Sequence, residues 1–307
     1  MIPIVLGATA VGKTGLLLAL SERIPIEVVS LDSRQIYRHM DIGTAKPTEI
    51  ERRLLKHWMI DVRNPDESFD AKQYREMAMS SVEKIISGGK IPVIAGGTGL
   101  YAEVLLKGLA SVPESDAAVR NALSQIEEDR PGTLRKLLRR FDYEAFCRIH
   151  ENDIKRTTRY LEVFFLTGLP LSLIQKEKEV SRDYGIIVLK RSRSELHKRI
   201  EIRAGEMLKT GLVEETESLL TLGYTSDLNA LKTIGYAEVV QYIWGSIMLE
   251  RALELIIRNT RRYARRQEIW FRRYQGAFGI DLSDLTETDS VRALENTILS
   301  VWGGNYG

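Results

Sequence analysis

Residues 7–14 read GATAVGKT and match the pattern G-x-x-x-x-G-K-[ST]. A loop of this kind holds phosphates because its backbone N–H groups point into one concavity at the start of a helix. Gly7 and Gly12 permit the tight turn, Lys13 would reach a terminal phosphate, and Thr14 would offer its hydroxyl to Mg²⁺. The motif predicts a phosphate ligand and leaves open which molecule carries it. The remaining backbone of the loop comes from Ala8, Thr9, Ala10 and Val11.

Asp32 is the acidic residue that is best placed to act beside this loop. It lies just past the apolar run IEVVS at 26–30, and residues beyond the carboxyl ends of parallel strands line the ligand crevice of an open α/β sheet. Thr98 follows the apolar run IPVIAGG in the same way, so we expect Asp32, Thr98 and the loop to converge. A turn or helix-cap role is the alternative for Asp32, and Asp61 in HWMIDV is the weaker acidic candidate.

A strongly basic segment at 258–274, RNTRRYARRQEIWFRRY, has seven arginines against one glutamate, Glu268. Read as a helix, it continues an apolar face on which side chains recur at seven-residue intervals. The favoured partner of such a helix is a polyphosphate or a nucleic acid, and the alternative is a basic surface helix without a partner. The apolar face consists of Ile256, Tyr263 and Trp270 together with Ile257, Ala264 and Phe271.

Short apolar runs predict the strands that must position these residues. They lie at 2–6, 26–30, 57–62, 91–97 and 185–190, and continuous apolar character suits strands that are buried on both faces. Helical segments at 13–23 and 70–87 alternate with the first strands, which predicts a parallel α/β sheet.

The pattern changes between residues 112 and 183, where no strand is expected. TLRKLLRRF and TTRYLEVFFLTG look helical, and the second should end at Gly168, before Pro170. The predicted fold class is therefore α/β, with a P-loop parallel-sheet core, a helical insertion domain and a helical C-terminal region. We expect the core and the C-terminal helices in 1–111 and 184–307, and the helical insertion domain in 112–183.

The composition is that of an ordinary soluble chain, with 307 residues, 44% hydrophobic and 28% charged, and a formal net charge of +2. The single cysteine, Cys147, excludes an internal disulfide and suits a reducing compartment. Apolar runs stay well short of the roughly 18 residues that span a bilayer, and IPIVL is too short for a signal peptide. We expect a cytoplasmic monomer with no membrane partner.

Six segments, in this order, resemble the tRNA dimethylallyltransferase family, also called tRNA isopentenyltransferases: GATAVGKT, SLDSRQIYRHMDIGTAKP, IPVIAGGTGLY, ENDIKRTTRYLEVFFLTG, LKTIGYAEVVQY and TRRYARRQEIWFRR. The likeness runs over nearly the whole chain, and its most specific part is LDSRQIY…MDIGTAKP. It implies transfer of the dimethylallyl group of dimethylallyl diphosphate to the exocyclic amine of the adenosine 3′ of the anticodon, giving N6-(dimethylallyl)adenosine and diphosphate. Ala8 stands where the family often has Pro, and Ala237 where a basic residue is common.

The resemblance also implies roles for individual residues. Asp32 would be the general base, Thr98 would lie where the two substrates meet, and Arg203 would lie near the leaving diphosphate. Residues 7–14 would bind that diphosphate, and Thr14 would help to hold Mg²⁺. The helical insertion domain at 112–183 would bind tRNA. Contacts with the tRNA anticodon stem-loop would come from Asp32, Ser33, Arg34, Gln35, Thr98, Arg120, Lys155, Arg156, Thr157, Thr158, Arg159, Lys232, Gly235 and Tyr236.

Three other functions share some of these features. A P-loop kinase of a small molecule would have the same loop and core, but it would leave the arginine helix unexplained. An adenylate isopentenyltransferase acting on free AMP or ADP would need no large helical insertion to grip RNA. A non-catalytic RNA-binding protein would leave the phosphate loop and Asp32 unused.

Overall fold

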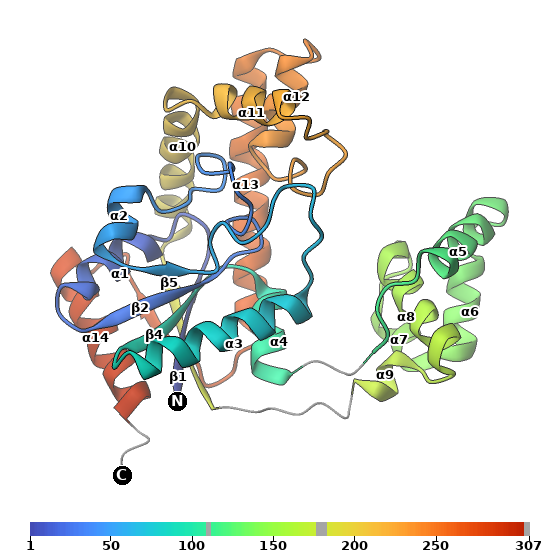
Figure 1. Ribbon diagram of the computed structural model, residues 1–307, viewed down its shortest axis with the longest axis horizontal. Coiled ribbons are helices and arrows are strands. Elements are labelled where there is room, and N and C mark those ends of the chain that lie inside the picture. Colours follow the sequence, from blue (N-terminus) through green and yellow to red (C-terminus); the bar gives the residue numbers. More distant parts are fainter. Residues whose placement is uncertain (109–111, 176–182, 304–307) are drawn as a thin grey trace. The chain divides into compact units, whose positions relative to one another are not determined.

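The computed structural model describes residues 1–108, 112–175 and 183–303. The chain forms two compact units, one made of Met1–Leu106 with Arg182–Gly307 and the other of Lys107–Ser181 (Figure 1). The first unit contains the sheet, and the described part of the second is built of helices. The expected domain limits at 111, 112 and 183 fall near these joins, where residues 109–111 and 176–182 lie outside the described ranges.

A six-stranded parallel sheet, ordered β3-β2-β4-β1-β5-β6, forms the centre of the larger unit. Gly96 of β4 is in register with Leu6 of β1 on one side and with Leu31 of β2 on the other. The loops that follow these three strands therefore begin at the same level of the sheet. The strands are β1 (Ile2–Gly7), β2 (Ile26–Leu31), β3 (His57–Trp58), β4 (Ile91–Gly96), β5 (Tyr184–Lys190) and β6 (Phe278–Asp281).

The sheet differs from the predicted one in two places. β3 covers only His57–Trp58, because Met59 and Asp61 have positive φ angles of 64° and 56° that take the chain out of the extended conformation. The prediction of a strand over 57–62 was therefore wrong beyond Trp58. β6 was missed: in Phe278–Asp281 only Ile280 is buried, so the segment lacks the continuous apolar run by which the other strands were recognised.

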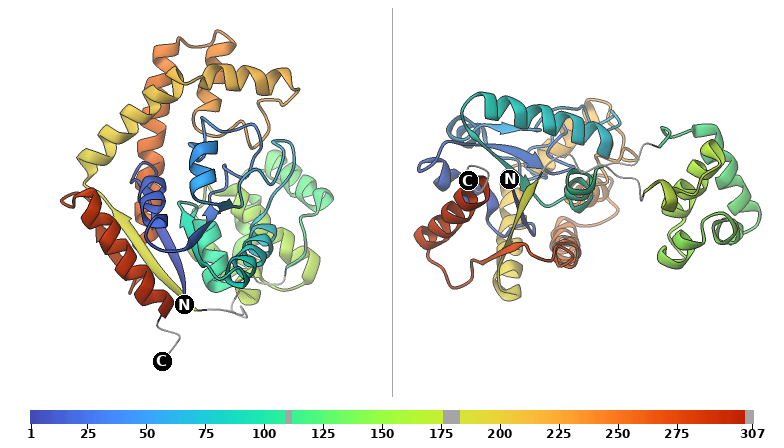
Figure 2. Two further views of the ribbon diagram at one scale, coloured as in Figure 1. Left: turned by 60° about the vertical axis from the view of Figure 1, so that its left-hand side comes forward. Right: turned by 90° about the horizontal axis from the view of Figure 1, so that it is seen from below.

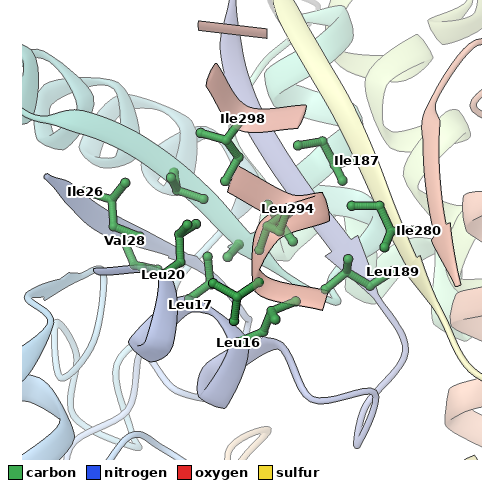
Figure 3. Close-up of a cluster of buried hydrophobic side chains, with 14 of the residues drawn as sticks. Leu16, Leu17, Leu20, Ile26, Val28, Ile187, Leu189, Ile280, Leu294 and Ile298 are labelled. Atoms are coloured by element: carbon green, nitrogen blue, oxygen red, sulfur yellow. The ribbon is translucent and has the colours of Figure 1, made fainter. Parts of the chain in front are cut away.

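Helices cover both faces of the sheet, and β1, β2 and β4 are therefore buried along their whole length. On one face, α1 (Lys13–Ser21) and α14 (Glu287–Gly303) pack together over the strands, and their leucines and isoleucines form the cluster drawn in Figure 3 together with side chains of β2, β5 and β6. Another helix, α3 (Ala71–Ser87), packs on β2 and β4. α3 begins at a capping box made by Asp70 and Gln73, and it buries Tyr74, Ala78, Ser81, Val82 and Ile85.

Four further helices of this unit pack in sequence against one another beyond the sheet (Figure 2). They share a second core, to which Ile36, Leu219, Tyr236 and Ile256 belong. These helices are α10 (Arg193–Lys209), α11 (Leu212–Thr221), α12 (Tyr236–Ile243) and α13 (Leu249–Phe271), and the unit is completed by α2 (Glu49–Leu54) and α4 (Gly99–Lys107).

The smaller unit has its own core, in which Leu123, Leu134 and Leu161 meet. The helix predicted from TTRYLEVFFLTG is found and ends at Gly168, whose φ of 74° is left-handed and whose N–H caps the carbonyl of Phe164. The helices are α5 (Ala117–Asp129), α6 (Thr133–Phe141), α7 (Tyr143–Arg148), α8 (Ile154–Thr167) and α9 (Leu171–Ile174). Within the described ranges, no helix combines the length and the apolar character needed to cross a membrane.

Candidate active site

The phosphate-loop sequence connects β1 to α1, as its pattern predicts. Gly12 is the N-cap of α1 and has a φ of 109°, a left-handed conformation that side chains strongly disfavour. Ala10 also has a positive φ, 65°, which for an alanine costs roughly 1 kcal/mol or more and marks a strained position. Strained backbone of this kind gathers at ligand-binding turns, because the surrounding structure must hold it in place.

Two arginines hold the strained loop from the side of β5 and α10. Arg191 donates from Nε to the carbonyl of Val11, and Arg199 donates from Nε to the carbonyl of Ala10, each at 2.8 Å. With these carbonyls bound to guanidinium groups, the loop carries positive charge beside the start of α1. Sequence reasoning did not find either arginine, because their contact with the loop depends on how β5 and α10 fold against β1.

Two further cations lie at the loop, and both side chains are only partly exposed. Burial lowers the pKa of Lys13 to about 8; the Asp32 carboxylate acts in the opposite direction, and the Arg203 charge adds to the lowering. Burial likewise lowers the pKa of Arg203 to about 10, again opposed by Asp32. Lys13 donates from Nζ to the carbonyls of Gly7, at 2.8 Å, and Ala8, at 3.0 Å. A bound anion would compensate both charges, which Asp32 alone does only in part.

Asp32 occupies the end of β2, where it was predicted. Its Oδ1 accepts the backbone N–H of Arg34 at 2.8 Å and that of Gln35 at 3.4 Å, so the carboxylate also shapes the following turn. Both of these hydrogen bonds use the same oxygen. The turn and the acid–base role that were weighed as alternatives are therefore compatible, because Oδ2 keeps its lone pairs for a ligand.

Thr98 joins the loop after β4 to the loop after β2. Its Oγ1 accepts the N–H of Ser33 at 3.0 Å, and its own N–H donates to the carbonyl of Leu31 at 3.1 Å. Tyr263 of α13 lies close to Thr98, and burial raises the pKa of the Tyr263 hydroxyl to about 12. The expected convergence of Asp32, Thr98 and the phosphate loop is thus present, and α13 supports it.

Two cavities meet at these residues. The first, of about 350 Å³, is lined by the phosphate loop, and we call it the phosphate cavity. The second, of about 320 Å³, extends along α10 and α13, and we call it the acceptor cavity. Residues that line both cavities are Thr9, Asp32, Thr44, Arg203 and Tyr263. Two ligands, one in each cavity, would therefore meet beside the carboxylate of Asp32.

The two cavities differ in their other lining residues. Lys13, Thr14 and Arg199 line the phosphate cavity, which suits an anion. The acceptor cavity combines apolar side chains such as Met207 and Ile256 with basic ones. The basic side chains are Arg34, Lys232 and Arg266. This mixture suits a flat apolar ring attached to a phosphate backbone.

Thr14 and Asp32 line the phosphate cavity with side-chain oxygens that suit a metal ion, and Glu51 lines it as well but accepts hydrogen bonds from Thr48 in the capping box of α2. Among the described residues, no group of three or more His, Cys, Asp or Glu side chains could hold a metal by itself. Such a sparse set of oxygens fits Mg²⁺, which keeps several waters and binds through one or two protein groups plus substrate phosphates. Asp61, the weaker acidic candidate, is occupied elsewhere, in ion pairs of 2.6 Å with Lys46 and Arg52.

The remaining residues predicted to contact tRNA in the larger unit fall into two groups. Arg34 and Lys232 line the acceptor cavity, and Arg34 also donates to the carbonyl of Asn229 at 2.7 Å. Gln35 and Tyr236 serve the local structure, since Gln35 accepts from Ser30 and Tyr236 is fully buried. Gly235, with a φ of 104°, precedes α12 and is also buried, so RNA contact by these three stays a prediction.

In the smaller unit, the predicted residues also separate by burial. Arg120 and Arg159 both bind the buried carboxylate of Glu162, at 2.9 and 2.7 Å. Thr157 is buried as well, with 1% of its surface exposed, whereas its neighbour Thr158 is half-buried. Lys155 and Arg156 are exposed, although Arg156 forms an ion pair of 3.4 Å with Asp153, and they are therefore the members of this group that can reach a phosphate backbone.

The arginine helix forms most of α13, and its face toward the protein is largely as predicted. Ala264 and Phe271 are buried, and α13 packs on α10 and α12 as well as on β1. Arg261 forms an ion pair with Glu201, whereas Arg266 reaches the acceptor cavity. Sequence reasoning missed Gln267, a buried polar residue in the middle of the basic run that hydrogen-bonds the phosphate loop.

Comparisons with known proteins agree with this geometry. The family model described as IPP transferase matches residues 35–274. A tRNA dimethylallyltransferase from Kosmotoga olearia is 55% identical over 307 residues, which are 100% of this chain and 99% of that protein. The crystal structure of a tRNA isopentenylpyrophosphate transferase from Bacillus halodurans is 31% identical with a TM-score of 0.73, and the match covers 100% of this chain and 99% of that one. A eukaryotic dimethylallyltransferase acting on tRNA, 24% identical with a TM-score of 0.84 over 99% of this chain and 79% of its own, shares the fold. This chain belongs to the IPP transferase family.

Proposed function

We propose that this protein transfers the dimethylallyl group of dimethylallyl diphosphate to the exocyclic amine of the adenosine 3′ of the anticodon in tRNA. The products are N6-(dimethylallyl)adenosine and diphosphate. The observation that carries the proposal is the meeting of two cavities of different character beside Asp32. The family membership supports the same activity.

The phosphate cavity takes the allylic diphosphate. As the bond from the allylic carbon to the bridging oxygen breaks, negative charge accumulates on the leaving diphosphate. Lys13 and Arg203 stabilise that charge where it develops, because they are partly buried cations that lack a full counter-charge before the ligand binds. The loop amides at the start of α1 add partial positive charge. These cations favour a polyphosphate ligand, and the family membership makes dimethylallyl diphosphate the ligand that we propose.

The acceptor cavity takes the adenine of the target nucleotide. Its exocyclic nitrogen forms the new bond to the allylic carbon and loses a proton, which Asp32 accepts. An adenine amine is a poor nucleophile, and a positioned base typically contributes about 10²- to 10⁴-fold in rate. Tyr263 lines both cavities and would help to keep water from the reactive allylic carbon, whereas Thr98 lines neither cavity and lies close to Tyr263.

Mg²⁺ fits the phosphate cavity through the hydroxyl of Thr14. When bound there, it would neutralise part of the charge on the phosphates of the donor. Thr14 is the second residue of α1 and lies two positions after the N-cap Gly12, so its hydroxyl is at the same helix start as the loop amides.

The tRNA substrate accounts for the basic residues around the acceptor cavity. Lys232 and Arg266 line this cavity, and Lys155 and Arg156 offer exposed charge on the smaller unit. Extracting one base from its stack costs a few kcal/mol, and phosphate contacts away from that base can offset the cost. The anticodon stem-loop is the proposed partner, and a cytoplasmic monomer is the form in which we expect the protein to act.

Substrate exchange tests the proposal. The protein is incubated with Mg²⁺ and dimethylallyl diphosphate in the presence of unmodified tRNA or AMP, and then with ATP in place of the allylic donor. We expect a dimethylallyl mass increment on one adenosine of the tRNA, none on AMP, and no phosphoryl transfer from ATP. Efficient modification of AMP would favour a free-nucleotide enzyme, and phosphoryl transfer without prenylation would favour a kinase.

A further inference from the structure

Gln267 connects the phosphate loop with the loop after β4, and it lines the phosphate cavity together with Thr9 and Gly97. It lies on α13 and is 6% exposed. Its Oε1 accepts the backbone N–H of Thr9 at 2.8 Å, and its Nε2 donates to the carbonyl of Gly97 at 2.9 Å. One planar amide thus spans the phosphate loop after β1 and the loop after β4.

The same helix contacts the next residue of the second loop. Tyr263, four residues before Gln267 and hence one turn away on the same face, lies close to Thr98. Thr9 is held a second time, through its hydroxyl, by Arg203. The position of Thr9 relative to Thr98 therefore depends on α13, and the shortest link between them is the side chain of Gln267.

We infer that Gln267 is a positioning residue that sets the separation between the phosphate loop and Thr98, and thereby the approach of the two substrates. This inference rests on the proposed transfer reaction. Gln267 need not touch the reacting atoms to matter, because a misplacement of about 1 Å far from the chemistry can cost about 10²-fold in rate. Its effect should fall on the transfer step and spare tRNA affinity, since both of its hydrogen bonds are within the protein.

Gly97 offers an independent way to break the same link. A Cβ added at Gly97 would lie 2.1 Å from Nε2 of Gln267. Its next neighbour outside Gln267 would be the carbonyl oxygen of Gly7, at an ordinary contact distance of 3.5 Å. The substitution Gly97→Ala should therefore push the amide away and leave the rest of the loop almost untouched. Gln267→Met removes both hydrogen bonds and keeps nearly the same side-chain volume.

The test compares Gln267→Met, Gly97→Ala and the double variant with the wild-type protein, all at saturating donor and tRNA. Gln241→Met is the matched control, because Gln241 is exposed on α12 and donates only to the carbonyl of Ala237 in its own helix. The readouts are the single-turnover rate of transfer, the tRNA dissociation constant and the melting temperature.

We expect each single variant to slow transfer by about 10²-fold while the tRNA dissociation constant stays within about twofold. The double variant should be no slower than the slower single variant, since both changes remove one link and coupled sites are not additive. Multiplied effects, single variants with wild-type rates, or rate losses matched by equal losses of tRNA affinity and melting temperature would each overturn the inference. If Gln267→Met does not fold, Gly97→Ala decides by the same criteria. Absence of transfer in the wild-type protein would contradict the proposed function as well.

Discussion

Asp32→Asn isolates the proposed base from the turn that Asp32 also supports. The N–H groups of Arg34 and Gln35 both donate to Oδ1, so an asparagine oxygen can keep these hydrogen bonds. What the variant loses is the negative charge and the second oxygen that would take the proton. We therefore expect tRNA to bind with unchanged affinity and transfer to slow by about 10²- to 10⁴-fold. At 1.36 kcal/mol per tenfold, this corresponds to about 3–5 kcal/mol of transition-state stabilisation.

Single-turnover transfer of dimethylallyl to tRNA, with both substrates saturating, measures this step directly. Asp281→Asn is the matched control, because the Oδ1 of Asp281 also accepts the N–H of the residue two positions later, Ser283, at 3.0 Å. Asp281 lies at the end of β6 and lines neither cavity. Transfer by Asp32→Asn at a rate within a few-fold of the wild type would remove Asp32 from the base role.

Three further predictions concern individual charges. Because the pKa of Lys13 is about 8, its protonated fraction falls as the pH rises through 8. Donor affinity measured by titration should therefore decrease from pH 7 to pH 9 in the wild-type protein but stay level in Lys13→Arg. A wild-type affinity that stays level over this range would contradict the role of the Lys13 charge in donor binding. Lys155→Ala and Arg156→Ala should each flatten the slope of log K for tRNA against log salt by about 0.7–0.9, whereas an unchanged slope would mean that they meet no phosphate. Glu162→Gln should destabilise the smaller unit by about 2 kcal/mol in thermal or denaturant unfolding, since it removes the charge-assisted hydrogen bonds from Arg120 and Arg159. Unaltered unfolding would show that these two ion pairs do not contribute to stability.

The Glu162 site also gives a pH dependence with a definite sign. Burial alone would raise the pKa of this carboxyl, but hydrogen bonds from Arg120 and Arg159 and from the N–H of Asp116 bring it below the ordinary value. A carboxyl with a lowered pKa in the folded state stabilises that state above its unfolded pKa. This contribution is therefore present at neutral pH and is lost as the pH falls through the folded pKa, below about 4.5.

Much of the larger unit could be predicted because its signals are local. Buried parallel strands are continuous apolar runs, and the phosphate loop is a contiguous pattern, so β1, β2, β4 and β5 and the convergence at Asp32 followed from the sequence. β6 could not be found in this way, because Phe278–Asp281 buries only Ile280 and owes its place to pairing with β5.

The supporting residues of the site could not be predicted for a similar reason. Arg199 and Gln267 contact the phosphate loop only because distant helices fold onto it, at sequence separations of 189 and 258 residues. In the sequence, each is one more polar residue in a basic helix. Arg203 was expected through the family resemblance, and no local pattern singles it out.

The central claim is that each cavity serves one substrate, with Asp32 between them. Measuring the dissociation constants of both dimethylallyl diphosphate and tRNA for Lys13→Ala and for Lys232→Ala tests this claim most directly. Lys13 lines only the phosphate cavity and Lys232 only the acceptor cavity. Lys13→Ala should weaken donor binding by roughly 10- to 100-fold, the worth of one hydrogen bond to a charged group, and leave tRNA binding unchanged. Lys232→Ala should weaken tRNA and spare the donor. Loss of tRNA affinity with intact donor binding in Lys13→Ala would contradict the account.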